Sequence, residues 1–177
     1  MEVINSTKLL GTIIQGDLNT ANIVKKVNAR MELLRKVASF GTSREELRNI
    51  YILFIRSLLE QSATVWHSSL TSDNSNDLER VQKSAMKVIF QENYNGYKYA
   101  LTILDLETLS DRREQLCLSF AQKCVKNKKT QHMFPLNNKT HNMNTRITEK
   151  FQVQYANTGR LKDSSIIYIQ TLLNEYE

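Results

Sequence analysis

Two stretches decide the fold class of this chain: Ile55-Arg-Ser-Leu-Leu-Glu-Gln-Ser-Ala-Thr-Val-Trp-His67 and Leu78-Glu-Arg-Val-Gln-Lys-Ser-Ala-Met-Lys-Val-Ile-Phe90. In the second stretch the apolar residues recur at steps of three and four, which is the period of a helix with one buried face. The first stretch continues a run from Leu47 that leaves almost no polar face, and a helix of that kind is usually central and buried. Together they predict a helical bundle.

Further helices are expected on both sides of these two stretches. Residues 20–39 carry an apolar stripe at helical spacing, with Asn19 or Thr20 as a cap. Ser43-Arg-Glu-Glu46 is a capping box, in which the hydroxyl and the carboxylate each satisfy a backbone amide. The other expected helices are 43–59, 76–90 with Ser75 as cap, 97–104, 111–126 with Ser110 as cap, and 165–174.

The remaining segments have other patterns. Residues 7–18 mix β-branched residues with two glycines and predict a short strand or hairpin. Residues 151–155 alternate apolar and polar side chains and predict a short strand. Residues 128–148 are rich in Asn, Thr and Lys, which is typical of a polar linker. The chain is therefore expected to be mainly α, divided at 1–18, 19–127, 128–148 and 149–177.

Composition places the chain among ordinary globular proteins. Of its 177 residues 41% are hydrophobic and 24% charged, and the formal net charge is +6. The longest apolar run, Ile50 to Leu59, contains Arg56 and is too short to cross a bilayer core of ~30 Å. We expect an intracellular protein without membrane contact, and the pattern does not distinguish nucleus from cytoplasm. Cys117 and Cys124 lie seven positions apart on one helix, too far for a disulfide, so both are expected to be reduced and buried.

No residue pattern in the sequence indicates catalysis. There is no Asp-Asp pair, no His-Glu-x-x-His and no glycine-rich phosphate loop. Cys117, Cys124, His132 and His141 are spaced more widely than the ligands of structural zinc sites. We therefore expect no catalytic residue, no metal and no cofactor, and the histidines are interpreted as ordinary surface or hydrogen-bonded side chains.

Basic residues form two clusters, each with a local excess of about +4. Such an excess favours a polyanion through release of its counterions, although a solvated face is the commoner origin of such clusters. Trp66 follows a long apolar helix, so we interpret it as a core residue rather than a base-stacking one. The first cluster is Lys25, Lys26, Arg30, Arg35 and Lys36 against Glu32; the second is Arg112, Arg113, Lys123, Lys126, Lys128 and Lys129 against Asp111 and Glu114.

Six blocks in this order resemble the region after the polymerase core in reverse transcriptases of jockey-like non-LTR retrotransposons. The first, Lys8-Leu-Leu-Gly-Thr-Ile-Ile, is similar to a strand that follows the catalytic aspartates of the family. The family polymerises DNA on RNA with paired aspartates, which this chain lacks. The resemblance therefore implies a non-catalytic C-terminal fragment of an RNA-directed DNA polymerase. The other five blocks are the Lys-rich segment ending in Leu34-Arg-Lys36, Ile55–Trp66, Leu78–Ile89, Leu104–Cys124 and Ala156–Asn174.

The resemblance also implies a function for the basic residues. Residues 19–127 would form the thumb, which packs beside the RNA–DNA hybrid and holds its backbone without reading sequence, and residues 1–18 would end the palm near the primer grip. The implied partners are that hybrid and the absent palm and fingers. The implied contact residues are Lys8, Lys25, Lys26, Arg30, Lys36, Lys83, Lys87, Arg112 and Arg113.

A second interpretation comes from a different class of protein. Ser57 and Ser84 stand where the family has proline and a basic residue, and fewer cations weaken a phosphate grip. The chain could thus be a helical protein–protein interaction module, or an inert or domesticated remnant of a mobile element. An apolar helix over 43–59 without its palm would also favour self-association.

Overall fold

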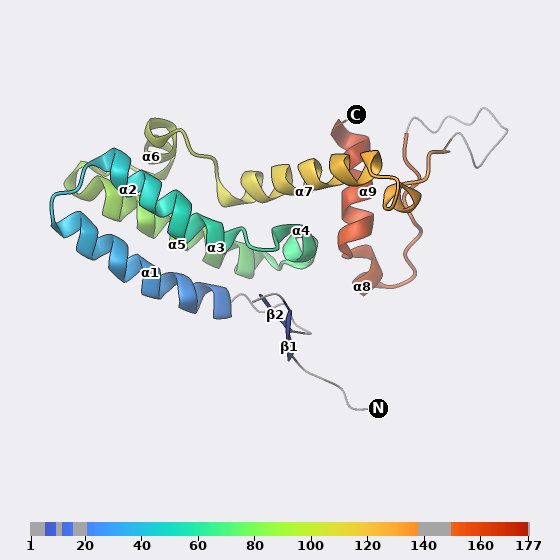
Figure 1. Cartoon of the computed structure of the whole chain (residues 1–177), viewed down its shortest axis with the longest axis horizontal. Helices are drawn as coiled ribbons and strands as arrows, with labels where there is room; N and C mark the ends of the chain where they lie inside the picture. Colours follow the sequence, from blue (N-terminus) through green and yellow to red (C-terminus); the bar gives the residue numbers. More distant parts are fainter. Residues whose placement is uncertain (1–5, 10–11, 16–20, 138–149, 177) are drawn as a thin grey trace. The chain divides into compact units, whose positions relative to one another are not determined.

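The computed structural model describes residues 6–9, 12–15, 21–137 and 150–176, and these are mainly helical, as predicted (Figure 1). The chain divides into two compact units: unit 1 is 1–63 with 70–112, and unit 2 is 64–69 with 113–177. This division differs from the expected boundary at residue 127, because helix α7 (Leu109–Lys126) begins in unit 1 and continues in unit 2. The short segment 64–69 joins unit 2 since the Ser68 and Ser69 hydroxyls donate to the Asp163 carbonyl, each at 2.8 Å.

Unit 1 is built on helices that pack side by side (Figure 1). These are α1 (Ala21–Ser39), α5 (Ser72–Phe90) and a continuous run of α2 (Arg44–Ile50), η1 (Tyr51–Arg56) and α3 (Ser57–Leu59), with α6 (Tyr97–Leu104) against α5. Their buried stripes confirm the predicted helical spacing. The core includes Val27, Met31, Leu34, Ala38, Leu47, Tyr51, Ile55, Leu59, Leu78, Val81, Ala85, Met86, Ile89 and Phe90.

Most helix boundaries agree with the sequence, and the differences have capping causes. The capping box of Ser43 and Glu46 is present, and its hydrogen bonds lower the pKa of Glu46. α6 has the predicted bounds. α5 begins before residue 76 because the Thr71 hydroxyl, rather than Ser75, accepts from the Asn74 amide at 3.2 Å. Likewise Thr108, not Ser110, caps α7 by accepting from the Asp111 amide at 3.1 Å.

The helix expected over 43–59 is continuous but widens into a π-helix at η1. The Ser57 amide donates to the Ile52 carbonyl, five residues earlier, and the Ser57 hydroxyl donates to the Leu53 carbonyl at 2.5 Å. The expected central and buried position holds for only one side of this helix, because Leu53 is 66% exposed and Phe54 is 50% exposed. One side of η1 therefore faces out of the core.

Two short strands precede α1. β1 (Ser6–Leu9) pairs antiparallel with β2 (Thr12–Gln15), and Ser6 lies opposite Gln15. The strand expected over 151–155 is wrong, since only a single bridge joins Phe151 to Leu136. Residues 138–149, which include the whole second half of the predicted linker, lie outside the described residues.

Unit 2 has its own core, formed by α7, η4 (Gln131–Met133) and α9 (Ser165–Tyr176), after the short α8 (Gly159–Lys162). Side-chain amides replace the expected strand pairing here. Asn174 holds the Phe151 amide at 2.9 Å and its carbonyl at 3.0 Å, and buried Gln170 bridges Gln154 and Met133. Trp66, in α4 (Ala63–Trp66), is buried as predicted, and so are both free cysteines. The core cluster of unit 2 is Ala121, Cys124, Phe134, Phe151, Ile169 and Leu173.

Candidate nucleic-acid interface

α1 presents its basic residues to solvent. Val27 and Met31 fix which face of the helix enters the core, and Lys25 and Lys36 lie on the opposite side, about three turns apart. Both are exposed. The acid of this helix, Glu32, forms a salt bridge with Arg35. Lys25 and Lys36 therefore stand on one face, and neither forms a salt bridge with another described residue.

Lys26 and Arg30 lie nearer to η1. Both are exposed, and the Arg30 guanidinium donates to the backbone carbonyl of Phe54. This hydrogen bond fixes the position of a charge that would otherwise move freely on a long side chain. Arginine has five N–H donors in all, so this hydrogen bond leaves other donors of the guanidinium for a ligand. Arg30 thus combines a structural contact with an exposed charge.

A second basic row follows α5. Lys83 and Lys87 are exposed, and their ammonium groups lie 5.3 Å from the ring centroid of Tyr97 and 6.0 Å from that of Tyr94. These cation–π contacts limit the positions of both lysines. The Tyr97 hydroxyl in turn bonds to the Glu79 carboxylate, and the pKa of Tyr97 is raised by burial and by that carboxylate.

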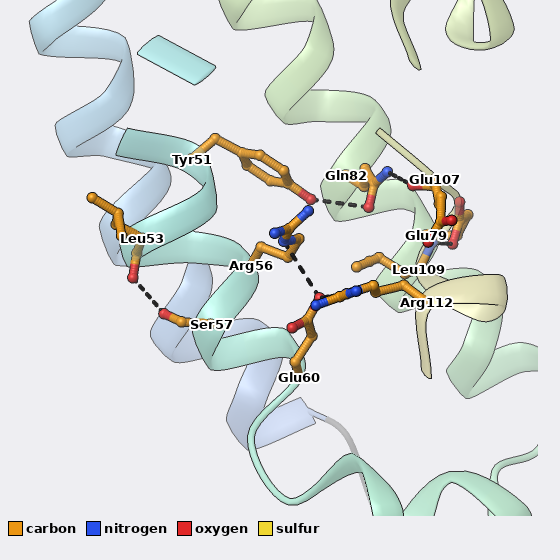
Figure 2. Close-up of polar contacts among 10 residues, drawn as sticks. All are labelled: Tyr51, Leu53, Arg56, Ser57, Glu60, Glu79, Gln82, Glu107, Leu109 and Arg112. Atoms are coloured by element: carbon orange, nitrogen blue, oxygen red, sulfur yellow. Dashed lines mark hydrogen bonds and ion pairs between the residues drawn. The ribbon is translucent and has the colours of Figure 1, made fainter. Parts of the chain in front are cut away.

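The two arginines at the start of α7 do not fit the predicted role equally well. Arg112 Nε lies 3.2 Å from Glu60 Oε1, which also receives Arg56 Nε at 3.4 Å (Figure 2). Arg113 is fully buried, and its Nε donates to His67 Nδ1 at 3.3 Å. The prediction that Arg113 contacts a phosphate is therefore wrong, because its charge is not at the surface. Arg112 is instead part of an ion pair inside unit 1.

The surroundings of Arg113 keep neighbouring groups in defined protonation states. Burial, then the charge of Arg113, lowers the pKa of His67, while Glu114 opposes the shift. His67 is thus favoured as a neutral acceptor, and its ring also packs edge-on against Tyr168 with centroids 5.4 Å apart. Burial raises the pKa of the Cys117 thiol to about 11, so this cysteine is a protonated core residue rather than a nucleophile.

A buried polar contact in unit 1 was not predicted. The Tyr51 hydroxyl donates to Gln82 Oε1 at 2.9 Å, and Gln82 Nε2 donates to the Glu107 carbonyl at 2.7 Å (Figure 2). Glu79 accepts from the Leu109 amide at 3.2 Å. The contact links η1, α5 and the segment before α7. The sequence does contain one indication of this contact, because Gln82 is a polar residue four positions after Leu78 on the buried stripe.

The described residues hold no group of three or more His, Cys, Asp or Glu side chains that could bind a metal ion. Within the same residues, no helix has the length and apolar character needed to cross a membrane. Lys8 belongs to β1, but its side chain lies outside what the structure describes. The described members of the predicted interface are thus those of α1, α5 and α7.

No family model, no curated protein and no solved structure matches this chain.

Proposed function

We propose that the chain is the non-catalytic, thumb-like C-terminal part of a non-LTR reverse transcriptase and that it grips the backbone of an RNA–DNA hybrid. The observation that carries the proposal is the exposed face of α1. Lys25, Lys26 and Lys36 are exposed, and none of them forms a salt bridge with another described residue. Cations in this state release phosphate counterions on binding and so favour a polyanion.

Lys83 and Lys87 would supply a second row of contacts. Their tyrosine neighbours restrict the side chains before binding, so less conformational entropy is lost when a phosphate is bound. Lysine binds phosphate as a point charge and has no planar fork to match a base edge. The proposed contact is therefore to the backbone, which positions a duplex without selecting its sequence.

Fluorescence anisotropy of the full chain with a labelled RNA–DNA hybrid of about 15 base pairs tests the proposal across a salt series. Because each neutralised phosphate contributes about −0.9 to the slope of log K against log salt, four to five contacts predict a slope of about −4. We expect micromolar binding at low salt. A second hybrid of unrelated sequence is expected to bind within about twofold.

The matched variants are Lys25→Glu/Lys36→Glu on α1 and Lys123→Glu/Lys126→Glu on α7. Both change the net charge equally, so a general electrostatic effect weakens binding equally in both. We expect the α1 variant to lose at least about tenfold in affinity and the α7 variant less than about threefold. Equal losses, or no binding at low salt by a folded chain, would contradict the proposal.

A further inference from the structure

An apolar surface lies where η1 packs beside α1. Its three members are Leu33, which is 51% exposed, Leu53, at 66%, and Phe54, at 50%. We call these three residues the α1–η1 face. They belong together because Arg30 bonds to the Phe54 carbonyl, and Leu33 lies one turn further along α1 on the same side. Large apolar side chains grouped in this way on a surface often mark an interaction site.

Two of these exposed side chains belong to the π-helical segment η1. Within η1, Tyr51 and Ile55 are buried, while Leu53 and Phe54 are exposed. Figure 2 shows the Leu53 carbonyl, which accepts from the Ser57 hydroxyl, away from the buried contact between Tyr51 and Gln82. π-helical turns occur frequently at functional sites. A regular α-helix would be the default for this sequence, so the widening is a second observation at the same place.

The border of the α1–η1 face on α1 is cationic. Lys26, Arg30 and Leu33 follow one another at steps of four and three, so two positive charges lie in line with the apolar residue. The anion of this helix, Glu32, already pairs with Arg35. An occupant that places apolar side chains on the face would bring its flanking residues close to Lys26 and Arg30.

We infer that the α1–η1 face binds an acidic amphipathic helix of another protein. Its apolar residues would contact Leu33, Leu53 and Phe54, and its carboxylates would lie against Lys26 and Arg30. This is the helix-in-groove mode of recognition, in which apolar anchors give affinity and charge gives orientation. A second copy of this chain fits less well, because a two-fold interface through the same face brings the cations of both copies together in a chain of net charge +6.

The experiment uses the full chain and two labelled synthetic helices of about 18 residues, or five turns. Both carry the same leucine stripe, and the other positions are glutamate in one and lysine in the other. We expect the glutamate helix to bind at least about tenfold more tightly than the lysine helix. The double variant Leu53→Ser/Phe54→Ser is expected to lose that binding by about tenfold or more, while the control Tyr155→Ser, at a residue 84% exposed in unit 2, does not.

Hybrid binding and oligomeric state separate this inference from the alternatives. The Leu53→Ser/Phe54→Ser variant changes no charge, so its affinity for the RNA–DNA hybrid is expected to stay within about twofold of the wild type. Circular dichroism checks that the variant is folded. The inference is overturned if the two helices bind equally, if the folded variant binds the glutamate helix like the wild type, or if sedimentation shows a dimer that this variant abolishes.

Discussion

The basic cluster on α1 and the one on α7 with the residues just after it have a similar excess of positive charge in the sequence, but the structure places their side chains differently. On α1, Lys25 and Lys36 are exposed and lie on one face. At the start of α7, Arg112 pairs with Glu60, and Arg113 is fully buried. A local count of charges therefore gives no account of which cations can reach a ligand. Whether a cation can reach a ligand depends on whether an acidic side chain or the apolar core lies against its position.

Helix geometry explains the contrast between the two adjacent arginines. With 3.6 residues per turn, successive side chains point about 100° apart. Arg112 therefore points to Glu60, which also pairs with Arg56 in unit 1, while Arg113 points to His67, within unit 2. On α1 the same rotation places Lys25 and Lys26 on the outer side, because Val27 is the residue that enters the core.

The largest expected effect comes from Arg113→Ala. Truncation of a fully buried arginine leaves a cavity and removes the donor to His67 Nδ1, so the free energy of unfolding is expected to fall by about 3 kcal/mol. Urea denaturation followed by circular dichroism measures this change. Affinity for the RNA–DNA hybrid, measured where the variant is still folded, is expected to stay within about twofold.

The matched control is the adjacent variant Arg112→Ala. Its side chain is 35% exposed, and Glu60 keeps Arg56 as a partner, so the expected loss is about 1 kcal/mol or less. If Arg113→Ala unfolds at the wild-type urea concentration, or if Arg112→Ala is the more damaging change, the contrast between the two arginines is wrong.

A smaller effect is expected on α5. Lys83→Ala/Lys87→Ala removes two exposed cations, and stability is expected to change by less than about 0.5 kcal/mol. If both contact phosphates, the slope of log K against log salt becomes less negative by about 1.8. Anisotropy titrations at several salt concentrations measure the slope. An unchanged slope would mean that α1 alone contacts the phosphates. The control is Ser84→Ala, a change at an exposed neighbouring residue that carries no charge.

Much of the fold could be predicted because local signals agree with it. The capping box at Ser43 starts α2, and the turn before it contains Gly41, whose φ of +78° favours glycine. The bounds of α6 follow from Gly96, with φ +112°, and from Asp105, which adopts the left-handed conformation at its end. The helix boundary at each of these positions depends on the local backbone conformation, which can be predicted from a short stretch of sequence.

The remainder depends on partners that are distant in the chain. Arg113 is buried beside His67, which lies 46 positions away, and no local pattern indicates that contact. The π-helix at η1 was not predicted because a segment apolar on every side gives no phase from which to read the turn. For the same reason the exposed Leu53 and Phe54 could not be distinguished from the buried Tyr51 and Ile55.

The smallest expected effect is the pH dependence that His67 gives to unit 2. Burial and Arg113 lower the pKa of His67 in the folded protein below its ordinary value of 6.5, while Glu114 partly opposes the shift. The folded state therefore binds fewer protons than the unfolded chain, and stability falls as the pH decreases through that ordinary value. Protonation would also place a cation on the nitrogen that now accepts from Arg113.

His67→Gln keeps an acceptor for Arg113 but does not titrate, so it isolates the contribution of His67. We expect the free energy of unfolding of the wild type to fall more steeply than that of His67→Gln between about pH 7.5 and pH 5.5. Urea denaturation at several pH values compares the two curves. Parallel curves would show that His67 titrates alike in the folded and unfolded states. The buried Arg113 would then contribute packing to unit 2 without fixing the protonation state of its neighbour.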